Sequence, residues 1–154
     1  MNYKHTQIGY PMLSVTLAVL VLFARIHVMS AAEPPSVDSG TNLLVTSIMV
    51  LILFVLASFG LLQVIIDGKY LRIKFGCGVY KKKFLLNEIV SAKTVKNHWY
   101  YGWGIRVWFW PKMWIYNVSG FDVVEIKLKN GKTYRIGTDE PEKLEQAMLN
   151  SIKK

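Results

Sequence analysis

An uncharged stretch from Leu43 to Leu62 constrains this chain more than any other feature of its sequence. A helix rises about 1.5 Å per residue, so a stretch of this length covers the roughly 30 Å hydrocarbon core of a bilayer. We therefore predict a transmembrane helix over residues 43–62. No linker follows it, because the hydrophobic period changes to two directly after Gln63. The remainder of the chain is expected to lie against the membrane surface.

A shorter apolar segment precedes this helix. The chain begins with a polar tail over residues 1–7 and becomes apolar from Ile8, and we predict a first span over about residues 8–29. Arg25 and His27 lie at its far end, where the arginine can snorkel to the headgroups or the two can form a functional polar pair inside the membrane. An alternative is a cleaved signal peptide, whose cleavage site would be the small residues 30–32.

The distribution of charge predicts the orientation. The net charge is +9, and the whole excess of Lys and Arg lies in residues 67–154. Cytoplasmic segments carry such an excess, and a basic module at a membrane also attracts anionic headgroups. We predict an external loop over about residues 30–42, a membrane anchor over 1–62 and a cytoplasmic domain over 63–154.

The pattern of the second half predicts a β-rich domain. Alternating apolar and polar residues are typical of half-buried strands, and Asp67-Gly68 and Asn130-Gly131 are strong hairpin signals. The predicted strands cover about residues 71–75, 79–89, 89–95, 105–110, 113–118, 124–128 and 132–136.

The chain is predicted to end in an amphipathic helix. Asp139 and Glu142 have the spacing of a capping box, and Leu144, Met148 and Ile152 form one apolar stripe. This stripe requires a sheet face or a barrel mouth against which it can be buried.

Four short motifs occur in an order and spacing that resemble a known family. They are Gly102–Arg106, Tyr116–Gly120, Val123–Ile126 and Ile136–Pro141. In this respect residues 63–154 resemble the bacterial pleckstrin-homology-like domain that follows two membrane helices in small bacterial membrane proteins. The resemblance implies an α+β fold, with a seven-stranded, strongly bent sheet or partly open barrel capped by a C-terminal helix and without catalytic machinery. Lys69, Arg72 and Lys74 lie near the first hairpin, where lipid-binding members carry paired basic residues, but do not match that pattern.

Aromatic and basic residues supply the candidate contact site. All five tryptophans lie between Trp99 and Trp114, and Trp and Tyr favour the membrane interface. We hypothesise that one rim of the domain dips into the inner leaflet while lysines hold anionic lipid. The alternatives are that the aromatics fill the core of a small barrel and that the lysines protect an exposed edge strand. The candidate residues are Lys81, Lys82, Lys83, Trp108, Trp110, Lys112 and Trp114.

The sequence offers little for catalysis. His5, His27 and His98 are scattered over three regions, and the single cysteine, Cys77, excludes an internal disulfide. We predict no enzymatic activity, no cofactor, no metal site and no nucleic-acid partner.

These features together predict a membrane-anchored binding or scaffold module, multi-pass in the cell inner membrane. Its cytoplasmic domain is expected to bind a protein segment or an anionic lipid surface, so the predicted partners are membrane lipids and either another protein or a second copy of the chain. One alternative is an oligomerising accessory subunit of a membrane complex. An enzyme is the second alternative.

Overall fold

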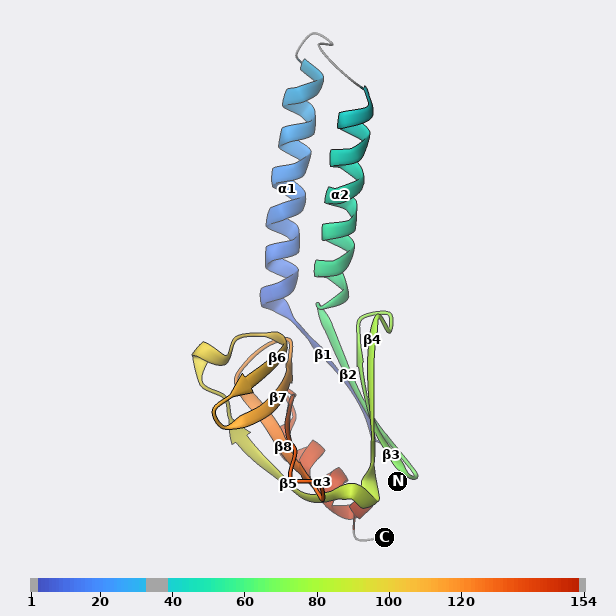
Figure 1. Ribbon diagram of the computed structural model, residues 1–154, viewed down its shortest axis with the longest axis vertical. Helices are drawn as coiled ribbons and strands as arrows, with labels where there is room; N and C mark the ends of the chain where they lie inside the picture. The colour runs from blue at the N-terminus through green and yellow to red at the C-terminus, as the bar shows by residue number, and fades with distance from the viewer. Residues whose placement is uncertain (1–2, 33–38, 153–154) are drawn as a thin grey trace.

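The computed structural model describes residues 3–32 and 39–152, in which two helices stand on two β-sheets (Figure 1). The predicted α+β class is confirmed. The elements are β1 (Tyr3–Ile8), α1 (Tyr10–Ala32), α2 (Ser39–Ser58), β2 (Leu61–Asp67), β3 (Tyr70–Phe75), β4 (Tyr80–Leu85), η1 (Leu86–Glu88), β5 (Ile89–Lys96), η2 (Trp99–Tyr101), β6 (Gly104–Phe109), β7 (Lys112–Asn117), β8 (Asp122–Leu128), β9 (Thr133–Gly137) and α3 (Pro141–Ile152).

The two N-terminal helices lie side by side and differ in apolar length (Figure 1). In α1 the segment Tyr10–Ser30 is long and apolar enough to cross a membrane, with a mean hydropathy of 2.1. The apolar part of α2, Leu43–Ser58, is shorter than a usual span. One helix of the described residues therefore has membrane length. Residues 33–38 of the predicted external loop lie outside the described part of the chain.

The prediction was wrong at both ends of this helical pair. Residues 3–8, predicted as part of a polar tail and the start of a helix, form β1, which pairs antiparallel with β2 from Tyr3↔Ile66 to Ile8↔Leu61. Residues 61–62, predicted as the end of the second helix, begin β2. The helix ends at Ser58 because Gly60 turns the chain, and the Gly60 carbonyl accepts a hydrogen bond from the Gly9 N–H at 2.7 Å. The helical pair is thus an insertion between two adjacent strands.

The described strands form two open sheets. Sheet A has the order β1-β2-β3-β4 and is antiparallel throughout, whereas sheet B has the order β5-β8-β9-β7-β6 with a parallel β7–β9 pair. The prediction of seven strands in one bent sheet or partly open barrel was therefore wrong. The two strands that it missed, β1 and β2, flank the helices, where a short polar tail and an uninterrupted apolar run hide the alternation of a strand.

The main hydrophobic core lies between the sheets and is closed by α3. Leu144 and Met148 of α3 are fully buried, with Ala147 and Ile152 packed partly against the same core, as the apolar stripe predicts. The predicted hairpins at Asp67-Gly68 and Asn130-Gly131 join β2 to β3 and β8 to β9, with positive φ at both glycines.

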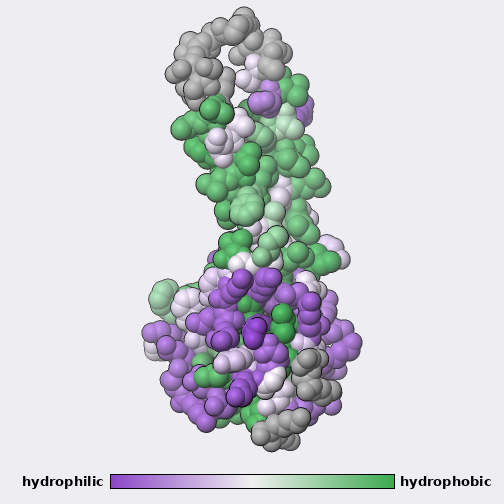
Figure 2. Space-filling view, turned by 90° about the vertical axis from the view of Figure 1, so that its right-hand side faces the viewer, coloured by the Kyte–Doolittle hydropathy of each residue, from purple (hydrophilic) through white to green (hydrophobic). Residues whose placement is uncertain are grey.

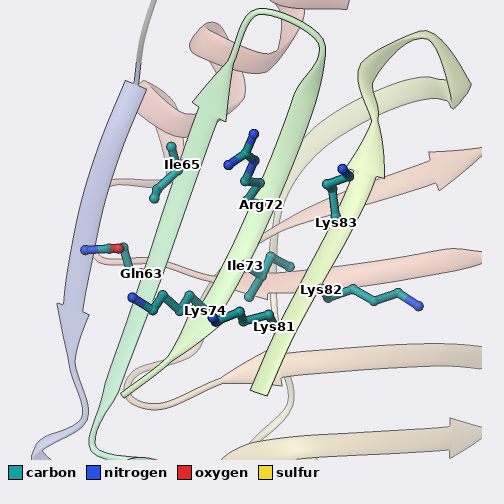
Figure 3. A pocket seen from close by; sticks show the side chains of 8 residues that line it. All are labelled: Gln63, Ile65, Arg72, Ile73, Lys74, Lys81, Lys82 and Lys83. Atoms are coloured by element: carbon teal, nitrogen blue, oxygen red, sulfur yellow. The ribbon is translucent and has the colours of Figure 1, made fainter. Parts of the chain in front are cut away.

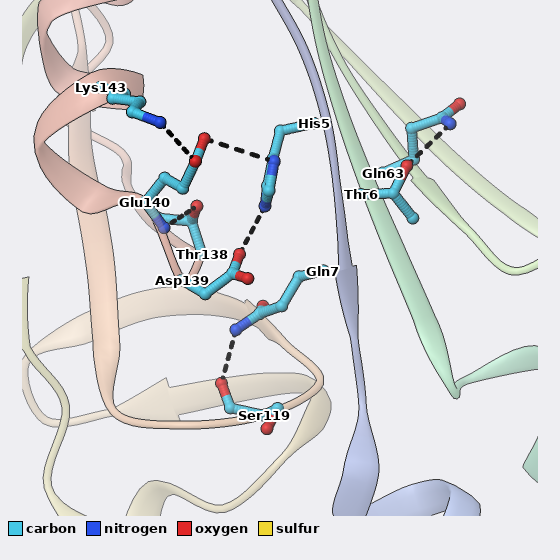
Figure 4. A network of polar contacts seen from close by, with 9 residues as sticks. All are labelled: His5, Thr6, Gln7, Gln63, Ser119, Thr138, Asp139, Glu140 and Lys143. Carbon is cyan, nitrogen blue, oxygen red and sulfur yellow. Dashed lines mark hydrogen bonds and ion pairs between the residues drawn. The ribbon is translucent and has the colours of Figure 1, made fainter.

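Strand β1 also ties sheet A to the rest of the domain (Figure 4). Two side chains of β1 contact residues outside sheet A. The Gln7 amide donates to the Ser119 carbonyl at 2.9 Å, and the His5 ring contacts Asp139 and Glu140 ahead of α3. The N-terminal strand is therefore an integral part of the fold.

Candidate ligand-binding face

The outer face of sheet A carries a block of basic side chains (Figure 3). Lys74 on β3 lies directly opposite Lys81 on β4, and Arg72 lies directly opposite Lys83 in the next row on the same face. The buried residues of β3 alternate with these positions, which is why the sequence folds with its cations outward. Like charges directly opposite each other destabilise a strand pair, so this arrangement has a cost that a bound anion would remove.

The two rows differ in how their charges are compensated. The Arg72 guanidinium lies 3.1 Å from the Asp67 carboxylate, and the Lys83 amino group lies 3.9 Å from the centre of the Tyr70 ring. For Lys74 and Lys81, no carboxylate of the described residues lies within 4 Å of either amino group. The Lys74–Lys81 row is therefore the stronger candidate for an anionic ligand.

This uncompensated row lies close to the base of the helices. The turn that joins β3 to β4 abuts the end of α2, since a Cβ added at Gly76 would overlap the Ser58 carbonyl oxygen. Lys74 is only two residues before Gly76, and the stems of Lys74 and Lys81 converge over Gly78 of the same turn. Figure 2 shows hydrophilic residues directly below the apolar helices on this side of the molecule.

The basic block borders an open groove of about 460 Å³. Besides the cations it is lined by Gln63 and Ile65 of β2 and by Ile73 of β3. The Gln63 amide donates to the Thr6 hydroxyl at 3.1 Å. The groove combines several cations with polar and apolar side chains, which suits an anionic ligand with an apolar portion.

The other face of β4 fixes it to the core. The Tyr80 hydroxyl lies 3.2 Å from the Tyr116 hydroxyl, and burial together with this contact raises the pKa of Tyr116. Phe84 is buried against Tyr134, with ring centres 4.7 Å apart. The lysines of β4 are therefore carried by a strand whose opposite face packs against the hydrophobic core.

The structure divides the predicted lysine triplet between two faces. Lys81 and Lys83 belong to the outer block, whereas the side chain of Lys82 leaves β4 on the opposite side, where its amino group lies 5.9 Å from the centre of the Phe84 ring. Lys82 still borders the groove at the edge of the strand. Arg72 and Lys74, which the sequence analysis placed near the first hairpin but did not include among the candidate contact residues, complete the block with Lys81 and Lys83. Pairing β3 with β4 across the Gly76–Gly78 turn is the signal that would have found them.

The predicted aromatic rim is not a single surface. Trp110 is 91% exposed at the turn between β6 and β7, but Trp108 packs against Tyr101 and Trp114 packs against the main core. Lys112 pairs with Phe109 at the same turn. This turn lies at the far end of β6 from Gly104, about 17 Å along the strand, and Gly104 is the end near Met12 of α1.

A different set of aromatics lies toward the helices. The Trp103 indole donates to the Gly120 carbonyl at 3.3 Å and its ring lies 6.4 Å from that of Phe121. The next residue in the chain is Gly104, the end of β6 near Met12 of α1. The yellow segment in Figure 1 contains η2 and lies on the same upper side, and its Trp99 is 79% exposed. The sequence analysis treated these aromatics as one site because they are close along the chain. In the fold they lie at opposite ends of β6.

The three histidines lie in different parts of the fold, His5 on β1, His27 on α1 and His98 ahead of η2, and of these His5 contacts Asp139 and Glu140. Among residues 3–32 and 39–152, no three His, Cys, Asp or Glu side chains form a metal-binding group. Cys77 is exposed in the turn between β3 and β4, and His98 stacks on Tyr100 with a centroid distance of 5.0 Å.

No protein-family model matches this chain, and comparison with curated proteins finds no similar sequence. The relation to pleckstrin-homology-like domains, suggested by four short motifs, therefore remains a proposal.

Proposed function

We propose that this protein is a membrane-anchored, non-enzymatic binding module whose outer sheet A face contacts anionic lipid headgroups. The observation that carries the proposal is the Lys74–Lys81 row, which has no carboxylate partner in the described part of the chain and lies beside the end of α2. Each basic residue near an anionic surface contributes about 1 kcal/mol of attraction. The relation to pleckstrin-homology-like domains is part of this proposal and is supported by the packing of α3 against the core.

The surface of both helices supports a two-helix anchor. Large apolar side chains are exposed along α1 and α2, among them Leu17, Val28, Leu51 and Phe54, and exposed apolar surface costs roughly 25 cal/mol per Å² in water. An apolar medium removes this cost. The α2 hydroxyl of Ser47 donates to the Leu43 carbonyl of the preceding turn, as a polar group in lipid requires.

The pairing of β1 supports a retained N-terminus. Cleavage after α1 would remove β1 and expose the edge of β2 along six paired residues. The excess of Lys and Arg in residues 67–154 supports a cytoplasmic location for the two sheets, with both helices crossing the inner membrane.

The single cysteine provides a direct test. The full chain, labelled at Cys77 with a fluorescent dye, is reconstituted in nanodiscs that carry a nitroxide quencher at the headgroup level. One nanodisc is pure phosphatidylcholine and the other contains phosphatidylglycerol. We expect stronger quenching with phosphatidylglycerol and reversal of this increase by salt.

Variants assign the effect to the proposed residues. The double variant Lys74→Glu/Lys81→Glu should lose the increase, whereas Lys127→Glu/Lys129→Glu, on β8 and the turn after it, should retain it. Equal quenching in both nanodiscs, or equal loss in both double variants, would refute the proposed headgroup contact.

A further inference from the structure

Strand β4 is an edge strand of sheet A, so half of its backbone N–H and C=O groups do not bond to another strand of that sheet. The Leu86 N–H donates to the Lys69 carbonyl at 3.0 Å, one position beyond the Tyr70↔Leu85 pair. Because bonded and non-bonded pairs alternate in an antiparallel ladder, the N–H and C=O groups of Lys81, Lys83 and Leu85 point away from β3. These groups can pair with a further strand.

The side chains of the same three residues lie on the outer face of the sheet. Lysines on an edge strand usually serve to prevent pairing with other chains. Preventing such pairing requires positive charge on the edge strand only. Here Arg72 and Lys74 continue the positive charge onto β3, directly opposite Lys83 and Lys81, and the groove extends over both strands. The charge therefore covers a face that an added strand's side chains would reach.

We infer that the free edge of β4 binds an extended acidic segment of a partner protein, which adds to sheet A as a further strand. Alternate carboxylates of the segment lie over Lys81 and Lys83, while its backbone bonds the free groups of β4. This inference goes beyond the proposed headgroup contact, because a lipid headgroup can use the lysines but cannot continue the backbone ladder. A second copy of this chain would bring its own lysines against these and is repelled.

The test uses the full chain in pure phosphatidylcholine nanodiscs, which contain no anionic lipid. The probe is a synthetic peptide of eight residues in which Glu and Thr alternate, and the control peptide has Lys in place of Glu. We expect saturable binding of the acidic peptide and none of the basic one. Lys83→Glu should weaken binding by roughly tenfold or more, while the exposed Lys129→Glu should leave it unchanged.

Two methylated peptides separate backbone pairing from attraction between charges. One carries N-methyl groups on its Glu amides and the other on its Thr amides, so each blocks one edge of the added strand. For antiparallel addition the residues opposite Lys81 and Lys83 face β4, so methylation of the Glu amides should abolish binding and methylation of the Thr amides should not. Parallel addition reverses the two results, and either asymmetry supports the inference.

Symmetric results overturn it. If both methylated peptides bind like the parent, only charge is recognised, and if neither binds, or the parent peptide itself does not, no strand is added at β4. A negative result here together with increased quenching in the phosphatidylglycerol nanodiscs would leave the headgroup contact standing alone. The two proposals therefore fail separately.

Discussion

Replacing Lys74 by Glu should stabilise the fold while it weakens the contact with anionic lipid. Lys74 and Lys81 are directly opposite each other, and the side chains converge over the following turn, where a Cβ at Gly78 would lie 2.8 Å from Lys74 Cε and 2.7 Å from Lys81 Cε. The variant replaces a repulsive pair by an attractive one at the same positions. Most substitutions destabilise, so an increase in stability is a distinctive result.

The expected magnitudes follow from the charges. Cross-strand charge pairs contribute roughly 0.2–1 kcal/mol in either direction, so the change from repulsion to attraction is about 1 kcal/mol. For a protein of this size such a gain raises the melting temperature by about 4 °C. Reversing one charge near an anionic surface removes about 2 kcal/mol of attraction, which lowers the ratio of headgroup-bound to unbound domain roughly 30-fold.

Both quantities are measured on the same full-length protein. Thermal unfolding in phosphatidylcholine nanodiscs is followed by tryptophan fluorescence, and headgroup contact by quenching of the Cys77 dye in phosphatidylglycerol nanodiscs. The matched control is Lys127→Glu, an exposed lysine on β8 whose cross-strand neighbours are Ser91 and Thr133. It should change neither quantity appreciably. A Lys74→Glu protein that melts below the wild type, or that retains its lipid-dependent quenching, would show that the two lysines do not interact as the structure places them.

Two further predictions concern the base of the helices and the last helix. Gly9→Ala should lower the free energy of unfolding by about 1–3 kcal/mol in denaturant titrations, because the added Cβ would lie 2.9 Å from Val118 Cβ and 3.0 Å from its carbonyl oxygen; an unchanged midpoint would contradict this close contact. Contact with Thr94, whose backbone N–H donates to the Glu145 carboxylate at 2.7 Å, lowers the pKa of Glu145. The carboxylate therefore stabilises the folded state above the ordinary pKa of about 4.3, and this contribution is lost as the pH falls through the lowered value. The melting temperatures of wild type and Glu145→Gln should therefore differ at pH 7 and converge in acid, and a difference that persists at pH 2 would exclude this explanation.

Features encoded by nearby residues could be predicted from the sequence. The hairpins at Asp67-Gly68 and Asn130-Gly131 depend on residues that accept positive φ, and α3 depends on an apolar stripe within twelve residues. The ends of the two N-terminal helices could not be predicted in the same way. The apolar run continues through Leu61 and Leu62 without a break, and their strand partners lie more than fifty residues away, in β1.

The candidate site shows the same division between local and distant information. Three consecutive lysines suggest one patch, but successive side chains of a strand point to opposite faces, so Lys82 is separated from Lys81 and Lys83. The tryptophans are close in sequence, yet β6 carries Trp108 away from Gly104, the end of the strand near α1, while Trp103 directly precedes that end. Positions on a sheet depend on register, which neither composition nor spacing specifies.

The insertion of the helices between β1 and β2 determines how the basic face would meet a membrane that the helices enter. A flexible linker would let the domain rotate, whereas here both helices continue directly into paired strands of the sheet that carries the lysines. The order in which the cations lie below the helix ends is therefore set by the backbone. Lys74 and Lys81 lie at the end of the sheet near the helices, and Arg72 and Lys83 lie about 7 Å further along the strands. Lys74 can thus contact headgroups while Lys83 and the outward backbone groups of β4 remain available to an acidic segment, so the two proposed ligands share Lys81 and otherwise use different parts of one face.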